Sequence, residues 1–130
     1  MKRIVRNASV WLLVSLFVYG RISWRGDYDA AHREALKTGK YLVVLLVDPA
    51  AKETSRVVRR LTRVDGRDVV AVLISKGISS YPIEMYYTTR FPALFVVDGR
   101  EVFVCKPMYG DAVTPDALRR CLYRIKGEAS

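Results

Sequence analysis

The segment YLVVLLVDPAAKETS, at residues 41–55, decides the fold of this chain. Its first seven residues are all apolar or aromatic and rich in β-branched side chains. Such a run indicates a strand that is covered on both faces. The Asp-Pro pair at residues 48 and 49 breaks this strand, and an amphipathic helix is expected from about residue 52 to residue 63.

The same reasoning places the other elements around this central strand. A first helix is expected over residues 27–38, with Asp27 as its N-cap and Gly39 at its end. Asp98-Gly99 predicts a two-residue hairpin. The remaining expectations are strands at residues 69–74, 93–97 and 101–105, a short helix at residues 83–87, and a last helix capped by Thr114 and ended by Gly127.

Taken in order, these elements predict an α/β fold. Two covered strands joined by a helix form a right-handed parallel βαβ unit, and the later strands add an antiparallel pair. We therefore expect a mixed sheet of four to five strands with helices on both faces.

This order and several local strings resemble the thioredoxin-like superfamily, in particular its exported members. The resemblance covers residues 24–125 and is carried by Trp24, by Gly39-Lys40 before the central strand, by FPALFVVDG at residues 91–99, and by Gly110 with the final helix. It implies a thioredoxin-like three-layer sandwich in which Pro92 takes the position of the family's cis-proline.

The chain departs from the family at the redox motif. The resemblance implies a Cys-x-x-Cys pair directly after the central strand, but residues 48–55 contain no cysteine. Dithiol exchange needs a low-pKa thiolate at a helix N-terminus and a second thiol that resolves the product. We therefore expect no such exchange at the usual site, no enzyme of that kind, and no cofactor.

A binding or assembly module is the function that we expect instead. Its partner, a protein or peptide of the cell envelope, would bind in the cleft between two loops, formed by Asp48, Pro49, Ala50, Phe91, Pro92 and Ala93. The backbone on either side of Pro92 would pair with an extended peptide. The alternative is that a cis X-Pro bond here only shapes the sheet and its loop.

Cys105 and Cys121 are the only cysteines, and they are 16 residues apart. This spacing fits no zinc motif, and the single histidine, His32, cannot complete a metal site, so we expect no metal. We interpret both as buried structural thiols. A disulfide is the alternative if their Cα atoms come close enough. An atypical thiol-disulfide oxidoreductase or redox-homeostasis protein that uses Cys105 or Cys121 is the competing function.

The chain is basic, with a formal net charge of +9, and its strongest charge cluster is Arg56, Arg59, Arg60 and Arg63, with Arg67 nearby. Such a cluster is usually a solvated helix face. It could also dock an acidic partner or an anionic membrane surface, which makes a basic envelope protein on anionic lipid a third function. No nucleic-acid motif accompanies it, and we expect no nucleic acid as partner.

The first 20 residues have the parts of a targeting signal. Lys2, Arg3 and Arg6 precede the uncharged run ASVWLLVSLFVY at residues 8–19, and Gly20 follows. A signal cut before Arg21 is our interpretation. An uncleaved anchor, although 12 residues are short for a span, and a buried N-terminal element are the alternatives. We expect residues 1–20 to be the signal or anchor and residues 21–130 the domain, which is exported, periplasmic or anchored to the inner membrane facing outward.

Overall fold

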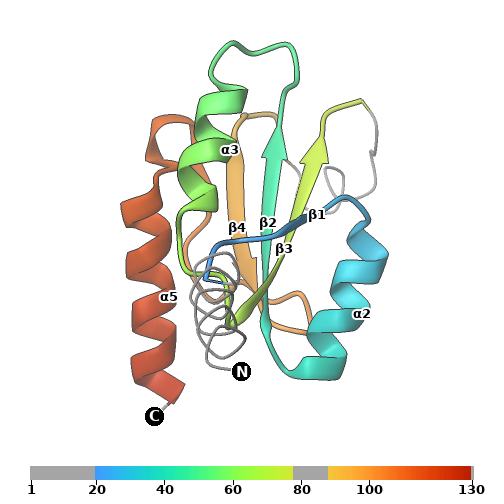
Figure 1. The fold of residues 1–130 in the computed structure, drawn as a ribbon, viewed down its shortest axis with the longest axis vertical. Helices are drawn as coiled ribbons and strands as arrows, with labels where there is room; N and C mark the ends of the chain where they lie inside the picture. The colour runs from blue at the N-terminus through green and yellow to red at the C-terminus, as the bar shows by residue number, and fades with distance from the viewer. Residues whose placement is uncertain (1–19, 78–87, 130) are drawn as a thin grey trace, which may run out of the picture.

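A computed structural model describes residues 20–77 and 88–129 (Figure 1). Its elements, in chain order, are β1 (Trp24–Arg25), α2 (Tyr28–Thr38), β2 (Tyr41–Val47), α3 (Thr54–Thr62), β3 (Val69–Ser75), β4 (Ala93–Val97), β5 (Met108–Tyr109), the 3-10 turn η1 (Gly110–Ala112) and α5 (Pro115–Ala129). The short helix expected at residues 83–87 lies outside the described residues. Within the described part, no helix has the length and apolar character that crossing a membrane requires.

The strands form one mixed sheet in the order β1-β3-β2-β4-β5. Strands β1, β3 and β2 run parallel, β4 runs antiparallel to β2, and β5 runs antiparallel to β4. This arrangement confirms the predicted mixed sheet and its parallel βαβ unit. Strand β2 lies at the centre, as the continuous apolar run of residues 41–47 predicted.

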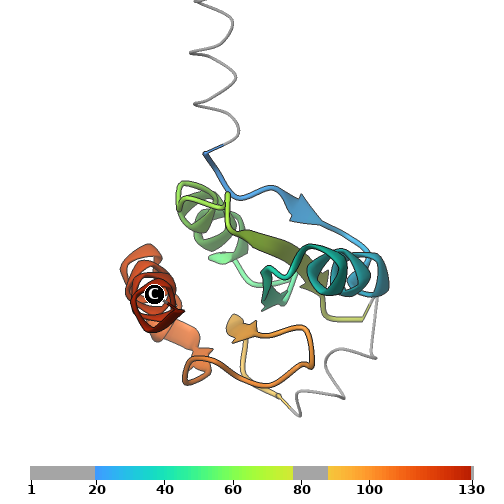
Figure 2. The same ribbon diagram turned by 90° about the horizontal axis from the view of Figure 1, so that it is seen from below.

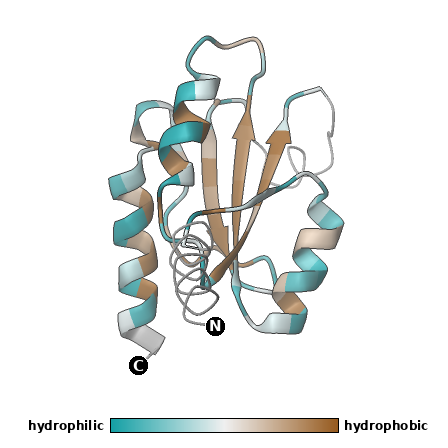
Figure 3. Ribbon diagram, viewed as in Figure 1, coloured by the Kyte–Doolittle hydropathy of each residue, from teal (hydrophilic) through white to brown (hydrophobic). Residues whose placement is uncertain are grey.

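Alternate side chains of β2 enter two separate cores. Val43, Leu45 and Val47 pack on the face that α3 and α5 cover. Leu42, Val44 and Leu46 pack on the other face, against α2. Figure 2 shows the resulting three layers, and Figure 3 shows apolar strands between helices whose outer surfaces are polar.

Local capping follows the sequence closely. The Asp27 carboxylate accepts a hydrogen bond from the Ala30 amide at 3.2 Å, and Gly39 ends α2 in the left-handed region at φ 72°. The Thr114 hydroxyl accepts from the Ala117 amide at 3.1 Å and caps α5. Helix α5 does not end at Gly127, because a glycine in an exposed helix interior costs only about 1 kcal/mol.

The hairpin expected after β4 is wrong in its detail. The Asp98 carboxylate accepts from the amides of both Arg100 and Val102, and Glu101 takes a φ of 65°. These side-chain bonds make a longer turn, and they compete with ladder formation. Only a bridge between Val97 and Phe103 remains of the strand expected at residues 101–105, and β5 forms the edge of the sheet instead.

A disulfide joins Cys105 to Cys121, with a Cα–Cα distance of 6.0 Å. The interpretation as two separate thiols is therefore wrong in this structure. The physical reason is that the chain after β4 crosses the face of the sheet that α5 covers, which brings Cys105 within disulfide distance of the buried stripe of α5. Both residues are buried, with exposed fractions of 8% and 6%.

Breaking this disulfide should destabilise the domain. The chain-entropy estimate for a closed loop of this length is about 3 kcal/mol, because the bond restricts the unfolded chain. We expect the urea midpoint of the oxidised protein to fall when a reductant is added. The C105A/C121A variant should already have the lower midpoint and should not respond to the reductant. Equal midpoints for the oxidised and reduced protein would contradict a stabilising role.

The first described residues are held against the end of α3. The Ile22 amide donates to the carbonyl oxygens of Thr62 at 3.1 Å and Val64 at 3.2 Å, and the Gly66 amide donates to the Gly20 carbonyl at 3.0 Å. A Cβ at Gly66 would lie 2.7 Å from the Cα of Ile22, so the two backbones touch. This packing fixes where residues 1–19 join the domain.

The Gly66→Ala variant should lower stability by about 1–3 kcal/mol, since the added methyl meets backbone that cannot move aside freely. Gly26→Ala is the matched control, because a Cβ at Gly26 meets nothing within 4 Å. Urea unfolding of both variants measures the difference. If Gly66→Ala and Gly26→Ala unfold together, the close approach of Ile22 is not what requires glycine at residue 66.

Candidate functional site

Three chain segments meet at one edge of the sheet. Leu46 pairs with Ala93 in the antiparallel ladder and Val47 pairs with Ser75 in the parallel one. The residues after β2, the residues after β3 and those before β4 therefore share this edge. The Lys76 amide donates to the Val47 carbonyl at 2.8 Å and ties two of these segments together.

The loop after β2 is closed by its own hydrogen bonds. The Asp48 carboxylate accepts from the Ala50 amide at 2.9 Å, and the Asp48 carbonyl accepts from the Thr54 hydroxyl at 2.6 Å and from the Ala51 amide at 3.1 Å. These turns occupy the residues where the helix was expected to start, so α3 begins at Thr54 and not at residue 52. Pro49 and Ala50 are exposed at the tip of this loop.

The opposite wall of the site is the Phe91-Pro92 segment. Its peptide bond is cis, which confirms the position assigned to the cis-proline. Phe91 and Pro92 are half-buried, and the Lys76 ammonium lies 5.6 Å from the centroid of the Phe91 ring. Arg90, beside them, holds its guanidinium carbon 5.2 Å from the Tyr109 ring centroid. The wall thus combines aromatic surface with two cations.

Ala93 does not belong to the accessible surface. It is fully buried, and β4 is paired with β2 on one side and β5 on the other at this position. The Pro92 carbonyl is also occupied, because it accepts from the Gly110 amide at 2.8 Å. Of the six residues predicted to bind a partner, Asp48, Pro49, Ala50, Phe91 and Pro92 therefore remain accessible.

Lys76 and Arg90 are the site residues that sequence reasoning missed. The segment between β3 and β4 carries no strong pattern, and a cation above an aromatic ring depends on the path of two loops. The position of Lys76 directly after a buried parallel strand was the available signal, since parallel strands end at the same edge.

Neither loop carries a thiol, and the two cysteines are joined within the core beneath α5. His32 serves the turn after β4, where its Nε2 lies 2.8 Å from the Gly99 carbonyl oxygen and 3.7 Å from a Glu101 carboxylate oxygen. Across residues 20–77 and 88–129, no three His, Cys, Asp or Glu side chains gather as a metal site would need.

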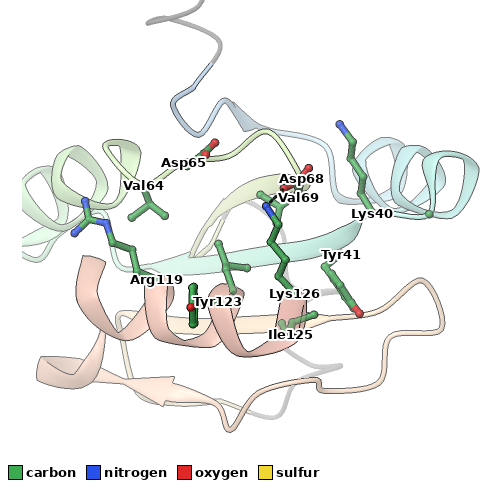
Figure 4. A pocket seen from close by; sticks show the side chains of 12 residues that line it. Lys40, Tyr41, Val64, Asp65, Asp68, Val69, Arg119, Tyr123, Ile125 and Lys126 are labelled. Atoms are coloured by element: carbon green, nitrogen blue, oxygen red, sulfur yellow. Dashed lines mark ion pairs between the residues drawn. The ribbon is translucent and has the colours of Figure 1, made fainter. Parts of the chain in front are cut away.

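An open groove of about 600 Å³ lies at the opposite end of β2 and β3 (Figure 4). Tyr41, Val69 and Ile125 line it, and Lys126 faces Asp68 across it at 3.9 Å. Sequence reasoning did not find this groove, because its lining comes from the starts of two strands, from α5 and from the turn before β3.

The arginines of α3 form a single stripe. Arg56, Arg59, Arg60 and Arg63 follow the spacing i, i+3, i+4, i+7, and all four are exposed on the side opposite the buried Leu61. Arg67 is separate from them, because its guanidinium hydrogen-bonds both carboxylate oxygens of Asp65. These hydrogen bonds lower the pKa of Asp65. We call Arg56, Arg59 and Arg60 of α3, together with its C-cap Arg63, the arginine stripe.

No protein-family model and no curated protein matches this sequence. Solved structures do match its fold. A crystal structure of Trxlp from Edwardsiella tarda EIB202 gives a TM-score of 0.60 at 17% identity, over 75% of this chain and 96% of that chain. The DsbH oxidoreductase gives 0.59 at 11% identity, over 80% and 83%. Trichomonas vaginalis thioredoxin gives 0.54 at 17% identity, over 84% and 94%.

Proposed function

Because the chain has a thioredoxin-like fold, we propose that it is a redox-inactive binding or assembly module of the bacterial cell envelope. One observation carries the proposal. The loop after β2, where the dithiol enzymes of this fold hold their cysteines, contains no thiol and is closed by hydrogen bonds around Asp48. The scaffold of the site is present without the group that would attack a disulfide.

The chemistry of the two walls supports an extended polypeptide segment as the ligand. Phe91 and Pro92 offer apolar surface for a side chain, and Lys76 and Arg90 favour acidic groups beside it. Pro49 and Ala50 close the other side. Because the Asp48 loop is already ordered by internal bonds, binding would lose little entropy in this wall.

Two features support the envelope as the place of action. The basic, then apolar, order of residues 1–20 is that of an export signal or anchor. The Cys105–Cys121 disulfide supports the same interpretation, since structural disulfides persist mainly in oxidising compartments.

Binding can be tested with a random-sequence peptide library immobilised on beads. We expect the peptides that retain the protein, when added to it in solution, to shift the amide NMR signals of residues 48–51, Lys76 and Phe91. Lys76→Glu should weaken the binding of acidic captured peptides by about fivefold or more, because it removes an attractive charge and adds a repulsive one. Lys37→Glu, at the end of α2 away from this edge, makes the same charge change and should have no effect. Signals that move only around Asp98 and Gly99 would refute the proposed surface.

The second candidate is a thiol-disulfide protein that uses Cys105 and Cys121. The bonded pair favours it, and two structural neighbours carry the word oxidoreductase in their names. Burial of both residues opposes it, because exchange requires a thiolate to reach a sulfur.

A turnover assay separates the two candidates. As a binding module, the native protein should not accelerate insulin reduction by dithiothreitol, and its disulfide should survive exposure to reduced glutathione. The disulfide is followed by the mass of the alkylated protein. If the native protein turns over and C105A/C121A does not, the redox function replaces our proposal. If C105A/C121A still binds the selected peptides, the binding module is supported.

A further inference from the structure

The arginine stripe carries uncompensated charge. Within the part of the chain that the structure describes, none of its four guanidinium groups has a carboxylate within ion-pair distance. Some other arginines are paired, such as Arg25 with Glu34 and Arg119 with Asp116. The stripe differs from single arginines that are unpaired among the described residues, such as Arg33 and Arg120, in bringing four such charges together on one helix face. Four arginines spaced along two turns of one helix face present a row of positive charge about 10 Å long.

The chain outside the structure joins the domain beside this row. Gly20 and Ile22 are bound to the backbone at residues 62–66, directly after the C-terminal end of α3. Figures 1 and 2 both place the first described residues next to that end of α3. The apolar run of residues 8–19 therefore connects to the domain next to Arg63, and three further cations lie at residues 2, 3 and 6.

We propose that the arginine stripe docks the domain on an anionic phospholipid surface. Charge complementarity selects an anionic partner. The position of the chain start selects lipid over an acidic protein where residues 8–19 are retained as the uncleaved anchor, because an apolar run in the bilayer then holds the stripe close to the headgroups. At physiological ionic strength a charge acts over about 8 Å, so this proximity is required. Each arginine near such a surface strengthens binding by about fivefold.

This orientation leaves the candidate peptide site accessible. The stripe runs from Arg56, near the Asp48 loop, to Arg63 at the chain start, and α3 projects these side chains away from the sheet. Asp48 and Phe91 lie at the far end of α3 from the chain start, a helix length of about 13 Å away. The proposal is independent of the peptide-binding function, because the two surfaces share no residue.

Vesicle binding of the full chain tests this proposal. The probes are vesicles of phosphatidylcholine alone and of phosphatidylcholine mixed with phosphatidylglycerol. We measure the partition coefficient for the mixed vesicles divided by that for phosphatidylcholine alone. The contribution of the apolar run is present in both coefficients and cancels in this ratio. R59Q/R60Q should lower this ratio by about 30-fold and flatten its dependence on salt. R33Q/K37Q on α2, across the sheet, removes the same charge and should change the ratio by less than about twofold.

The outcomes are distinct. A wild-type ratio near one, or equal losses in R59Q/R60Q and R33Q/K37Q, overturns the proposal, because net charge and not the stripe would then control binding. If R59Q/R60Q binds vesicles as the wild type does but no longer captures an acidic protein, the stripe binds a protein partner. This result also overturns the proposal. If R59Q/R60Q has a lower urea midpoint than the wild type, R56Q/R63Q provides the same comparison.

Discussion

Strand β2 is buried on both faces, and the rest of the structure depends on this. Its side chains are shared between two cores, three on each face, and each fully buried Val or Leu stabilises the fold by about 1.5–3 kcal/mol. Neither face can remain exposed to water, so α2 must cover one and α3 with α5 the other. The parallel partner β3 and the antiparallel partner β4 occupy both of its hydrogen-bonding edges.

The candidate peptide site follows from the directions of these strands. Where β2 and β3 end and β4 begins, three loops meet at one edge and bring Asp48, Lys76 and Phe91 together. Many thioredoxin-like proteins use this edge for thiol chemistry, but here the thiols lie in the core, where Cys105 and Cys121 crosslink the chain after β4 to α5. The three loops therefore meet at this edge without a thiol, while the two cysteines are bonded to each other in the core.

The two ends of α3 separate the two surfaces that we propose for binding. Its N-terminal end follows the Asp48 loop, and its C-terminal end holds the chain start through the Ile22 amide. Gly66 allows the backbone of Ile22 to approach closely at this attachment. The proposed lipid contact of the arginine stripe and the proposed peptide edge are therefore compatible within one small domain.

Local patterns in the sequence were sufficient for much of the fold. The apolar run at residues 41–47, the caps at Asp27 and Thr114, and the cysteine-free loop at residues 48–55 all depend on neighbouring residues, so each could be predicted without coordinates. The same holds for Pro92 and for the two loops of the candidate site, because the order of the strands places them.

Only the tertiary structure decided the contacts between distant residues. The sequence left open the Cys105–Cys121 bond, the cation above Phe91 and the groove beside Ile125. It misplaced the edge strand, because Asp98 bonds the amides that a hairpin ladder would use. By itself, the sequence determined the three helices α2, α3 and α5, the three long strands β2, β3 and β4 with their order, and the missing redox pair. Which side chains meet was decided by the register of the paired strands and by the paths of the loops, because these bring together residues that are far apart in the chain.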